Sequence, residues 1–431
     1  MSTGEQVLRP DPLWRVPAVR RLVGVTLLGF VGFAATLAAL PWWAVRGGAT
    51  VAQAGLVTTA MLAATVLTQT AVPALVARLG EGRSLALGLV LLGAPSPLLL
   101  LSSDLAPLLA VSAVRGTGFA VLTVVGSTMT STLAPPGRHG ETAGLYGLAV
   151  GLTGVGVVPG AVAVAQGVGF WPVALAATLP VTAVPWALQM ARDERAAARS
   201  HLDASGERLH GEVGDGPGGT GASASRVPDG VSARPGAAHH RAVVLRVLVP
   251  SLVLLVVTLA GSGVVTFLPI ERPDGLVAPV ALLLFGATSA VARWRAGMLA
   301  DRLGTRLLLP GSAVVAGVGT AGIAGGLLLG SDPVLLLAAA VAGVGYGAVH
   351  NLTLVQAFAR VTPADTPTAS AVWNLCFDGG TAIGAVAVGA LAAALASDGG
   401  LVGASSGIAY ALVACGVLVL AAAPAGLREP R

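Results

Sequence analysis

Apolar runs long enough to cross a membrane recur along the whole 431-residue chain, and they restrict its fold more than any other feature. A helix needs about 20 apolar residues to span the hydrocarbon core of a bilayer. In lipid, only helices and closed barrels satisfy every backbone polar group. The runs are continuous in Leu, Val, Ala and Gly, whereas barrel strands are segments of about ten residues with alternating polarity. The sequence therefore predicts an all-α integral membrane protein.

These runs predict twelve transmembrane helices. Their approximate bounds are 22–43, 52–76, 84–102, 106–133, 142–166, 170–190, 243–268, 276–298, 307–329, 333–358, 367–396 and 403–425. The run at 276–298 is the least regular, because Arg293 and Arg295 interrupt its end. Ten and fourteen spans are the alternative counts.

The distribution of charge supports an even number of spans. Only 10% of the residues are charged, whereas a soluble protein has roughly a quarter. If the N-terminus is cytoplasmic, the cytoplasmic segments hold nearly all of the Arg residues, and the opposite side holds only Arg46 and Arg272. Cytoplasmic loops of membrane proteins carry such an excess of basic residues. We therefore predict a multi-pass protein of the plasma membrane with both termini in the cytoplasm. The high pI reflects these flanking charges and does not indicate binding to nucleic acid.

Residues 193–241 form a polar segment between two halves, 1–192 and 242–431. The segment is rich in Gly, Ser, Ala, Asp and His and has almost no large apolar residues. Such a composition cannot bury a core, so a disordered cytoplasmic linker is expected. His239 and His240 at its end are interpreted as part of this solvated linker, with a metal site as the weaker alternative.

The two halves repeat one another. Three pairs of segments match: Ala77–Gly80 with Asp301–Gly304, Gly116–Ala120 with Gly343–Gly347, and Thr142–Ala143 with Thr368–Ala369. The paired residues are separated by a nearly constant interval in the numbering, about 225 residues. Two six-helix halves joined by a linker are typical of transporters with parallel repeats, whose substrate site lies between the halves near the middle of the membrane.

The segment from Gly297 to Arg306 has the pattern G-x-x-x-D-R-x-G-x-R, and with it the chain resembles the major facilitator superfamily. The residues that carry the pattern are Gly297, Asp301, Arg302, Gly304 and Arg306. The resemblance implies the fold of that superfamily and a loop that biases a cytoplasmic gate. Physically, Asp301 can cap a helix end while the two Arg side chains stay at the headgroup level. Topological anchoring alone is the alternative.

The first-half copy of this loop departs from the pattern. Arg78, Gly80 and Arg83 are present, but Pro73 stands in place of the leading Gly and Ala77 in place of the Asp. The charge network that the resemblance implies at the first-half gate is therefore incomplete.

Two further motifs resemble those of proton-linked carriers. Arg115 to Gly118, in the run at 106–133, is similar to the Arg-plus-glycine motif of that group. In the run at 142–166, a set of small residues is loosely similar to the motif of drug:proton antiporters: Gly151, Gly154, Gly156, Pro159 and Gly160. Close helix packing is the alternative explanation for these glycines.

Asp378 is the only carboxylate well within a predicted span, and Asn374 lies one helical turn before it. A charge in hydrocarbon is costly, so such a residue is a candidate for function. Removing a carboxylate from water favours its protonated form, which a proton-coupling site needs. The alternative is that Asp378 caps an irregular helix or pairs with an Arg.

Other polar side chains within the spans are further candidates for the site: His350, Asn351, Tyr346, Gln69 and Arg115. His350 can carry or relay a proton, or simply bond a neighbouring helix. Arg115 is expected to offset a charge on the substrate or on Asp378, or to brace its helix. Arg293 is expected to snorkel toward the headgroups or to brace the gate.

The sequence has no phosphate-binding Gly-Lys-Ser/Thr loop, no nucleophile elbow and no Cys/His metal spacing. We therefore expect no enzyme activity, no metal and no cofactor. We predict a monomeric secondary transporter whose partners are the lipid bilayer, an amphipathic or lipophilic solute and protons. Proton-driven efflux is the expected direction, with proton and solute alternating at a site that involves Asp378. The alternatives are solute:proton uptake, and a transporter-like sensor or assembly protein without transport activity.

Overall fold

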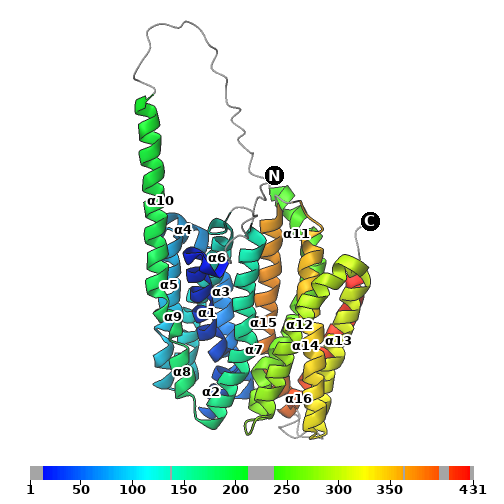
Figure 1. The fold of residues 1–431 in the computed structure, drawn as a ribbon. Coiled ribbons are helices and arrows are strands. Elements are labelled where there is room, and N and C mark those ends of the chain that lie inside the picture. Colours follow the sequence, from blue (N-terminus) through cyan, green and yellow to red (C-terminus); the bar gives the residue numbers. More distant parts are fainter. Residues whose placement is uncertain (1–12, 136–137, 212–236, 363–364, 398–406, 428–431) are drawn as a thin grey trace, which may run out of the picture.

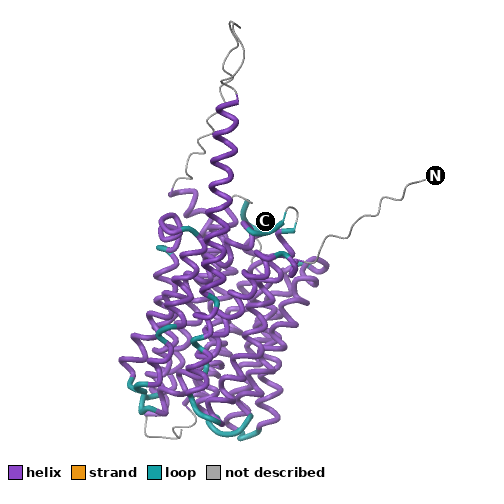
Figure 2. The backbone as a smooth tube through the Cα atoms, turned by 60° about the vertical axis from the view of Figure 1, so that its left-hand side comes forward, coloured by secondary structure: helices purple, strands orange, loops and turns teal. Residues whose placement is uncertain are grey.

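The computed structural model describes residues 13–135, 138–211, 237–362, 365–397 and 407–427. In this part of the chain all regular structure is helical (Figure 2). Twelve of the helical segments are long and apolar enough to cross a membrane. They fall on the twelve predicted runs, including the irregular one, which is observed as Val277–Ala300. The prediction of an all-α membrane protein with twelve spans is thus confirmed.

The first half contains six spans, several of which are broken. Its elements are η1 (Leu13–Arg15), α1 (Pro17–Leu37), α2 (Ala39–Arg46), α3 (Val51–Gln69), α4 (Val72–Leu79), α5 (Glu81–Gly93), η2 (Ser96–Leu100), α6 (Leu105–Thr132), α7 (His139–Gly167), α8 (Trp171–Ala176), α9 (Leu179–Thr182) and α10 (Val184–Gly211). Pro95, Pro172 and Pro180 stand at or next to breaks, because proline cannot donate a backbone hydrogen bond to the preceding turn.

The second half has six nearly continuous spans. They are α11 (Ala237–Glu271), α12 (Val277–Leu303), α13 (Thr305–Leu328), α14 (Asp332–Phe358), α15 (Thr366–Ser397) and α16 (Gly407–Ala422), followed by η5 (Ala423–Leu427). In Figure 1 the two halves stand side by side, and α10 projects beyond the bundle at one end. We call this the linker end. The first and last described elements, η1 and η5, lie at the same end (Figure 1).

The prediction of a disordered linker over 193–241 is wrong at both of its ends. Helix α10 continues through Gly211, and α11 already begins at Ala237. The segment after residue 192 is rich in Ala, Arg, Glu and Leu, which are strong helix formers even where no core is available. Residues 212–236, the remainder of that prediction, lie outside the described residues.

Helix packing follows the internal repeat. Gly116 of α6 lies against the backbone of α3, where an added Cβ would be 2.0 Å from the Met61 carbonyl oxygen. Its counterpart Gly343 of α14 lies against α12, with the Phe285 oxygen 2.2 Å from the same position. Only glycine permits this approach of two helix backbones. The matched glycines therefore make equivalent helix contacts in the two halves.

The halves meet along α3 and α15, which run antiparallel. Gly55 lies so close to α15 that an added Cβ would be 1.8 Å from the Ala385 carbonyl oxygen. Nearer the linker end, the Thr59 hydroxyl donates a 2.7 Å hydrogen bond to the carbonyl of Ala382. These contacts hold the two helix backbones together along a seam between the halves.

A second seam joins α7 to α11 and α12. At the end opposite the linker, the Gln166 amide donates to the carbonyls of Pro269 and Arg272, at 3.1 and 3.0 Å. Gly286 of α12 faces the backbone of Gly154 in α7. The two seams place α3, α7, α12 and α15 between the halves.

Candidate functional site

Asp378 lies on the seam between α3 and α15. Its side chain is buried, and its Oδ2 accepts a 3.1 Å hydrogen bond from the Gln69 amide in the other half. Gln69 is the last residue of α3, just before the break that leads to α4. The structure thus brings together two of the residues that the sequence analysis selected.

Two stacked rings of α15, those of Trp373 and Phe377, lie next to the pair of Asp378 and Gln69, and we call them the aromatic wall. His350 of α14 meets the rings of Trp373 and Phe377 edge-on, with centroids 4.7 and 5.1 Å away. Trp373 is fixed by a 3.1 Å hydrogen bond from its indole N–H to the Thr353 hydroxyl. The Nδ1 atom of His350 is enclosed without a hydrogen-bond partner. Sequence reasoning missed the two rings of α15, although they lie four residues apart and one of them immediately precedes Asp378.

Tyr346 and Arg293 complete this side of the site. The tyrosine interacts electrostatically with both Arg293 and Asp378, and His350 interacts with Arg293. The Asn351 amide donates a 2.7 Å hydrogen bond to the Arg293 carbonyl. Arg293 therefore lies next to α14 within the span of α12, and the expectations that it snorkels or braces the gate stay predictions.

Asn374 does not join the cluster, although it lies one turn before Asp378. Its side chain is exposed, and its amide donates to the Ser370 carbonyl at 2.9 Å. An amide that bonds the preceding turn of its own helix has little capacity left for a neighbouring helix.

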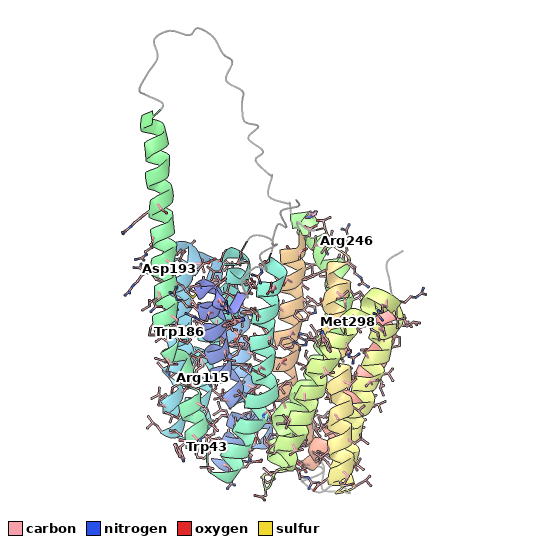
Figure 3. All side chains as sticks on the ribbon, viewed as in Figure 1. Trp43, Arg115, Trp186, Asp193, Arg246 and Met298 are labelled. Carbon is pink, nitrogen blue, oxygen red and sulfur yellow. The ribbon has the colours of Figure 1, made fainter. Side chains whose placement is uncertain are left out.

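Arg115 lies apart from the cluster, about midway along the first half (Figure 3). Its side chain is fully buried, and its guanidinium donates to the carbonyls of Leu92 and Gly32 and to the Thr36 hydroxyl. These bonds tie α6 to α5 and α1. The arrangement matches the bracing role rather than a contact with Asp378.

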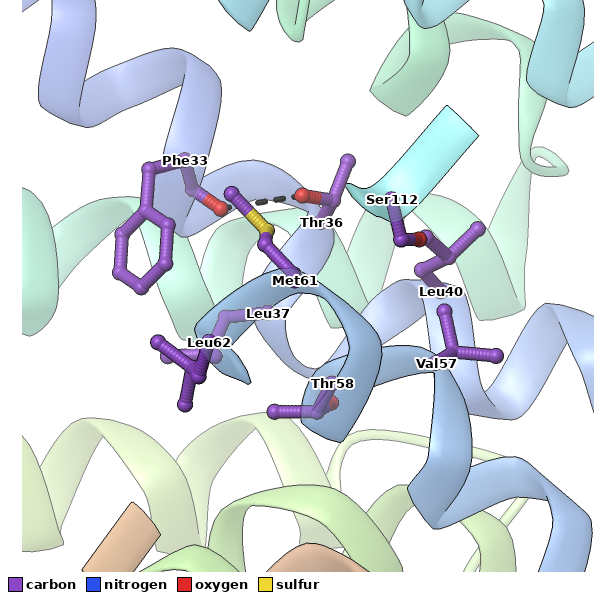
Figure 4. A pocket seen from close by; sticks show the side chains of 9 residues that line it. All are labelled: Phe33, Thr36, Leu37, Leu40, Val57, Thr58, Met61, Leu62 and Ser112. Atoms are coloured by element: carbon purple, nitrogen blue, oxygen red, sulfur yellow. Dashed lines mark hydrogen bonds between the residues drawn. The ribbon is translucent and has the colours of Figure 1, made fainter. Parts of the chain in front are cut away.

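A small hollow adjoins this brace and lies between α1, α3 and α6 (Figure 4). It has room for about one water molecule. Thr36 and Ser112 line it, and the Thr36 hydroxyl donates to the Phe33 carbonyl. The Ser112 hydroxyl is buried without a partner. The rest of the lining is apolar, so the hollow is too small and too dry to hold an organic solute.

The two predicted gate loops share one backbone shape at the linker end. Gly80 has φ 83° and ψ 165°, and Gly304 has φ 74° and ψ 167°. The loop arginines are exposed, namely Arg78, Arg83, Arg302 and Arg306. Asp301 lies in the last turn of α12, and its side chain is outside the described part. Gly297 packs against the Asn351 amide.

The first-half loop gains its acidic partner from α10. The Glu194 carboxylate accepts hydrogen bonds from the backbone N–H groups of Glu81 and Gly82, at the start of α5. The neighbouring Asp193 forms an ion pair with Arg21 of α1. Negative charge is favourable at a helix N-terminus. Glu194 thus supplies a carboxylate near the loop in which Ala77 replaces the patterned Asp.

The glycines of the α7 motif do not mediate close packing in this conformation. A Cβ added at Gly151, Gly154, Gly156 or Gly160 would meet no described atom within 4 Å. Pro159 is buried inside α7. The close approach of α7 to the other half is made by Gly286 of α12 instead.

A further contact ties the start of α11 to the connection between α14 and α15. The His239 ring lies 2.8 Å from the Asp365 carboxylate, which also accepts a 2.8 Å hydrogen bond from the Thr362 hydroxyl. The hydrogen bond to His239, followed by that from Thr362, lowers the pKa of Asp365 below its ordinary value of 3.8. His239 thus serves a helix contact, and in the described part of the chain no group of three or more His, Cys, Asp or Glu is placed to hold a metal.

Comparisons with known proteins agree with this architecture. A family model of the Major Facilitator Superfamily matches residues 22–385. No curated protein matches the sequence. Among solved structures, the chain is similar to a bacterial homologue of the human lysosomal transporter Spinster in an inward-facing, unoccupied conformation. The identity is 16%, the coverage 97% of both chains, and the TM-score 0.74.

Two further solved structures are similar over nearly their whole length. The nucleoside transporter NupG is 12% identical, with 96% of this chain and 100% of that chain covered and a TM-score of 0.69. A peptide transporter, POT, in complex with sulfate is 14% identical, with 94% of each chain covered and a TM-score of 0.64. At these identities the likeness concerns the fold, whereas the family match spans most of the sequence, from the first span into α15. This chain belongs to the major facilitator superfamily.

Proposed function

We propose that this chain moves a small organic solute across the membrane by alternating access, and that Asp378 carries the coupled proton. The observation behind the proposal is the position of Asp378, buried on the seam and bonded to Gln69 of the opposite half. When the halves move relative to one another, this bond must rearrange. An ionised carboxylate needs a donor or water far more than a protonated one does. Protonation and the orientation of the halves are therefore coupled.

The surroundings of Asp378 support this role. In the twelve spans it is the only carboxylate placed away from a span end, and its one described hydrogen bond comes from a neutral amide. A carboxylate paired with an Arg would tend to stay ionised. Asp378 lacks an ion-pair partner among the described residues, which leaves it able to gain and lose a proton.

We place the linker end of the bundle in the cytoplasm and the protein in the plasma membrane. The exposed loop arginines at that end, such as Arg78, Arg83 and Arg302, support this orientation. Labelling of single cysteines introduced in the exposed loops of intact cells tests it.

Proton-driven efflux is the direction that the sequence motifs favour. The motif at Arg115 resembles that of proton-linked carriers and the motif in α7 loosely resembles that of drug:proton antiporters, and the spans offer mostly apolar side chains for a solute. Solute:proton uptake is the second candidate, because Arg293 places a positive charge near Tyr346, the tyrosine that also lies within electrostatic range of Asp378. Right-side-out and inside-out vesicles separate the two directions.

Transport by purified protein in vesicles tests the coupling. A pH-sensitive dye inside the vesicles reports proton flux, while a panel of lipophilic drugs, aromatic acids, sugars and amino acids is added outside. Asp378→Asn is expected to abolish solute-dependent proton flux and to leave exchange of solute for solute in place. The reason is that exchange needs the halves to move but no proton to be carried.

Asp332→Asn is the matched control, because Asp332 is a carboxylate at the start of α14 with an ion pair to Arg272. This variant should retain proton flux. Unchanged proton-driven transport in the Asp378→Asn protein would remove Asp378 from the coupling mechanism.

A further inference from the structure

The guanidinium of Arg293 lies within the span of α12 without a hydrogen-bond or ion-pair partner among the described residues. Its Nε atom is enclosed and unpaired. The side chain as a whole is only partly buried, so the terminal nitrogens retain some access to the surroundings. A charged group within a membrane is normally paired or faces a polar cavity. The unpaired guanidinium therefore points to a missing anionic partner.

The backbone at this position is held firmly. The Asn351 amide bonds the Arg293 carbonyl at 2.7 Å, and Gly297, one turn further along α12, leaves room for that amide. A fixed backbone limits the positions that the guanidinium can reach. By contrast, Arg295 on the same helix is exposed and lies over the Trp294 ring, with its guanidinium carbon 5.5 Å from the ring centroid.

The groups around Arg293 suit the acidic end of an organic solute. Tyr346 and His350 of α14 interact with the guanidinium, and Asp378 interacts with the same tyrosine. The partly buried ring of Phe377 extends the site with an apolar surface, and the buried ring of Trp373 is stacked with it, with the centroids 6.1 Å apart. A guanidinium binds carboxylate and phosphonate through two parallel N–H donors, which suits a planar acidic group.

We propose that Arg293 recognises the acidic group of the transported solute, which is an organic anion with an apolar body of about the size of one aromatic ring. The inference rests on the proposed transport function and names its substrate class. The acidic group contacts the guanidinium between α12 and α14, and the apolar body lies against the aromatic wall of α15.

The proposal also relates solute binding to the proton. The titratable groups that act on the guanidinium are Tyr346 and His350, and Asp378 lies beyond the tyrosine. The helices α7, α11 and α13, which also contact α12, contribute no group to these described interactions. Among the described interactions Arg293 and Asp378 are thus joined only through Tyr346, so that solute binding at the guanidinium and proton binding at the carboxylate take place at separate groups.

Binding of charge-matched probes to the purified full-length protein tests the proposal. The acids are benzoate, phenylphosphonate and hexanoate, and the ring-matched controls are benzyl alcohol and benzylamine. Tryptophan fluorescence reports binding, because Trp373 lies in the site. At least one acid is expected to bind about tenfold more tightly than benzyl alcohol, an effect typical of a charge-assisted contact.

Variants assign this binding to Arg293. Arg293→Gln should weaken the preferred acid about tenfold and leave benzyl alcohol unchanged, while Arg293→Lys, which keeps the charge but loses the two parallel donors, should restore only part of the affinity. Arg295→Gln, the exposed neighbour, should behave as the unmodified protein. Retained benzyl alcohol binding shows that a variant is folded. The proposal is overturned if no acid binds better than the alcohol, or if the Gln variants of Arg293 and Arg295 behave alike.

This experiment needs no pH gradient and no transport, so its outcome is independent of the proton-coupling test. Acid binding that disappears in Arg293→Gln would stand even if Asp378→Asn transported normally. Conversely, if Asp378→Asn uncouples transport but no acid binds, the proposed function stands and the assignment of an acidic solute to Arg293 is overturned.

Discussion

The Gln69 amide donates a 3.1 Å hydrogen bond to the Asp378 carboxylate, and this bond joins the end of α3 in one half to the middle of α15 in the other. Gln69 also stands where the second span breaks between α3 and α4. A side chain at a helix break can change its position with a small rotation of the backbone. Movement of the halves can therefore break this bond and expose the carboxylate in the same step.

Replacing Gln69 by Leu should loosen the seam between α3 and α15. A hydrogen bond to a charged group contributes about 1.5–3 kcal/mol, so its loss should shift the balance of conformations about tenfold or more. The measurement is oxidative cross-linking of a Thr59→Cys/Ala382→Cys pair, which faces across the seam. Cys376 and Cys415 are first replaced by Ser so that only the introduced pair reacts.

Cross-linking of this pair should be slower in Gln69→Leu than in the parent. Thr68→Val, one residue earlier on α3, provides the control because its side chain makes none of the described contacts to α15. Equal cross-linking rates in Gln69→Leu and the parent would show that the bond does not hold the seam.

Arg115→Lys should destabilise the first half. The guanidinium reaches three acceptors on α1 and α5 at 2.8–3.1 Å, and a single ammonium group cannot match that spread. Loss of two buried hydrogen bonds from a charged donor costs roughly 3–6 kcal/mol. The midpoint of heat-induced unfolding in detergent should fall by several degrees. Arg83→Lys, at an exposed position, should leave the midpoint unchanged, and a similar fall in both variants would argue against the brace.

The sequence predicted the spans and the repeat well, because the length of an apolar run and a periodic motif are local properties. It also selected Asp378 and Gln69, since polar side chains are rare within these spans. It could not show that the two residues bond, because they are far apart in the chain and depend on the register of α3 against α15. The neighbours of Arg293 could not be predicted for a similar reason, because they depend on the packing of α12 on α14.

Asp365 should contribute stability in a defined pH range. Its pKa is lowered by the hydrogen bonds to His239 and Thr362, so the folded protein binds the proton of this group less readily than the unfolded chain. The stabilisation is complete above the ordinary pKa of 3.8 and disappears as the pH falls through the lowered value. Asp365→Asn should therefore lower the unfolding midpoint at pH 7 and pH 5, while the difference between the two proteins should shrink as the pH falls progressively below 3.8.

Asp274→Asn is the control for this prediction, because Asp274 lies in an exposed loop. It should leave the midpoint unchanged throughout. A destabilisation of Asp365→Asn that stays the same however far the pH falls below 3.8 would mean that packing, rather than the charge of the carboxylate, explains the effect.

The two gate-loop glycines allow a matched comparison between the halves. Both adopt a positive φ with ψ near 165°, a region that side chains other than glycine avoid at a cost of about 1–3 kcal/mol. An added Cβ at Gly304 meets open space, whereas at Gly80 it lies 3.1 Å from the Glu194 carboxylate. Gly80→Ala should therefore lower the unfolding midpoint more than Gly304→Ala, because it combines backbone strain with a displaced carboxylate.

Glu194→Ala distinguishes the two causes. In its background, Gly80→Ala should cost no more than Gly304→Ala, since only the backbone strain remains. Such non-additivity is expected for residues in direct contact. If the difference between the two glycine variants persists without Glu194, the carboxylate is not what makes the first-half turn more demanding. If it vanishes, Glu194 acts on the turn directly, and the first-half loop relies on α10 where the second-half loop carries its own acidic residue.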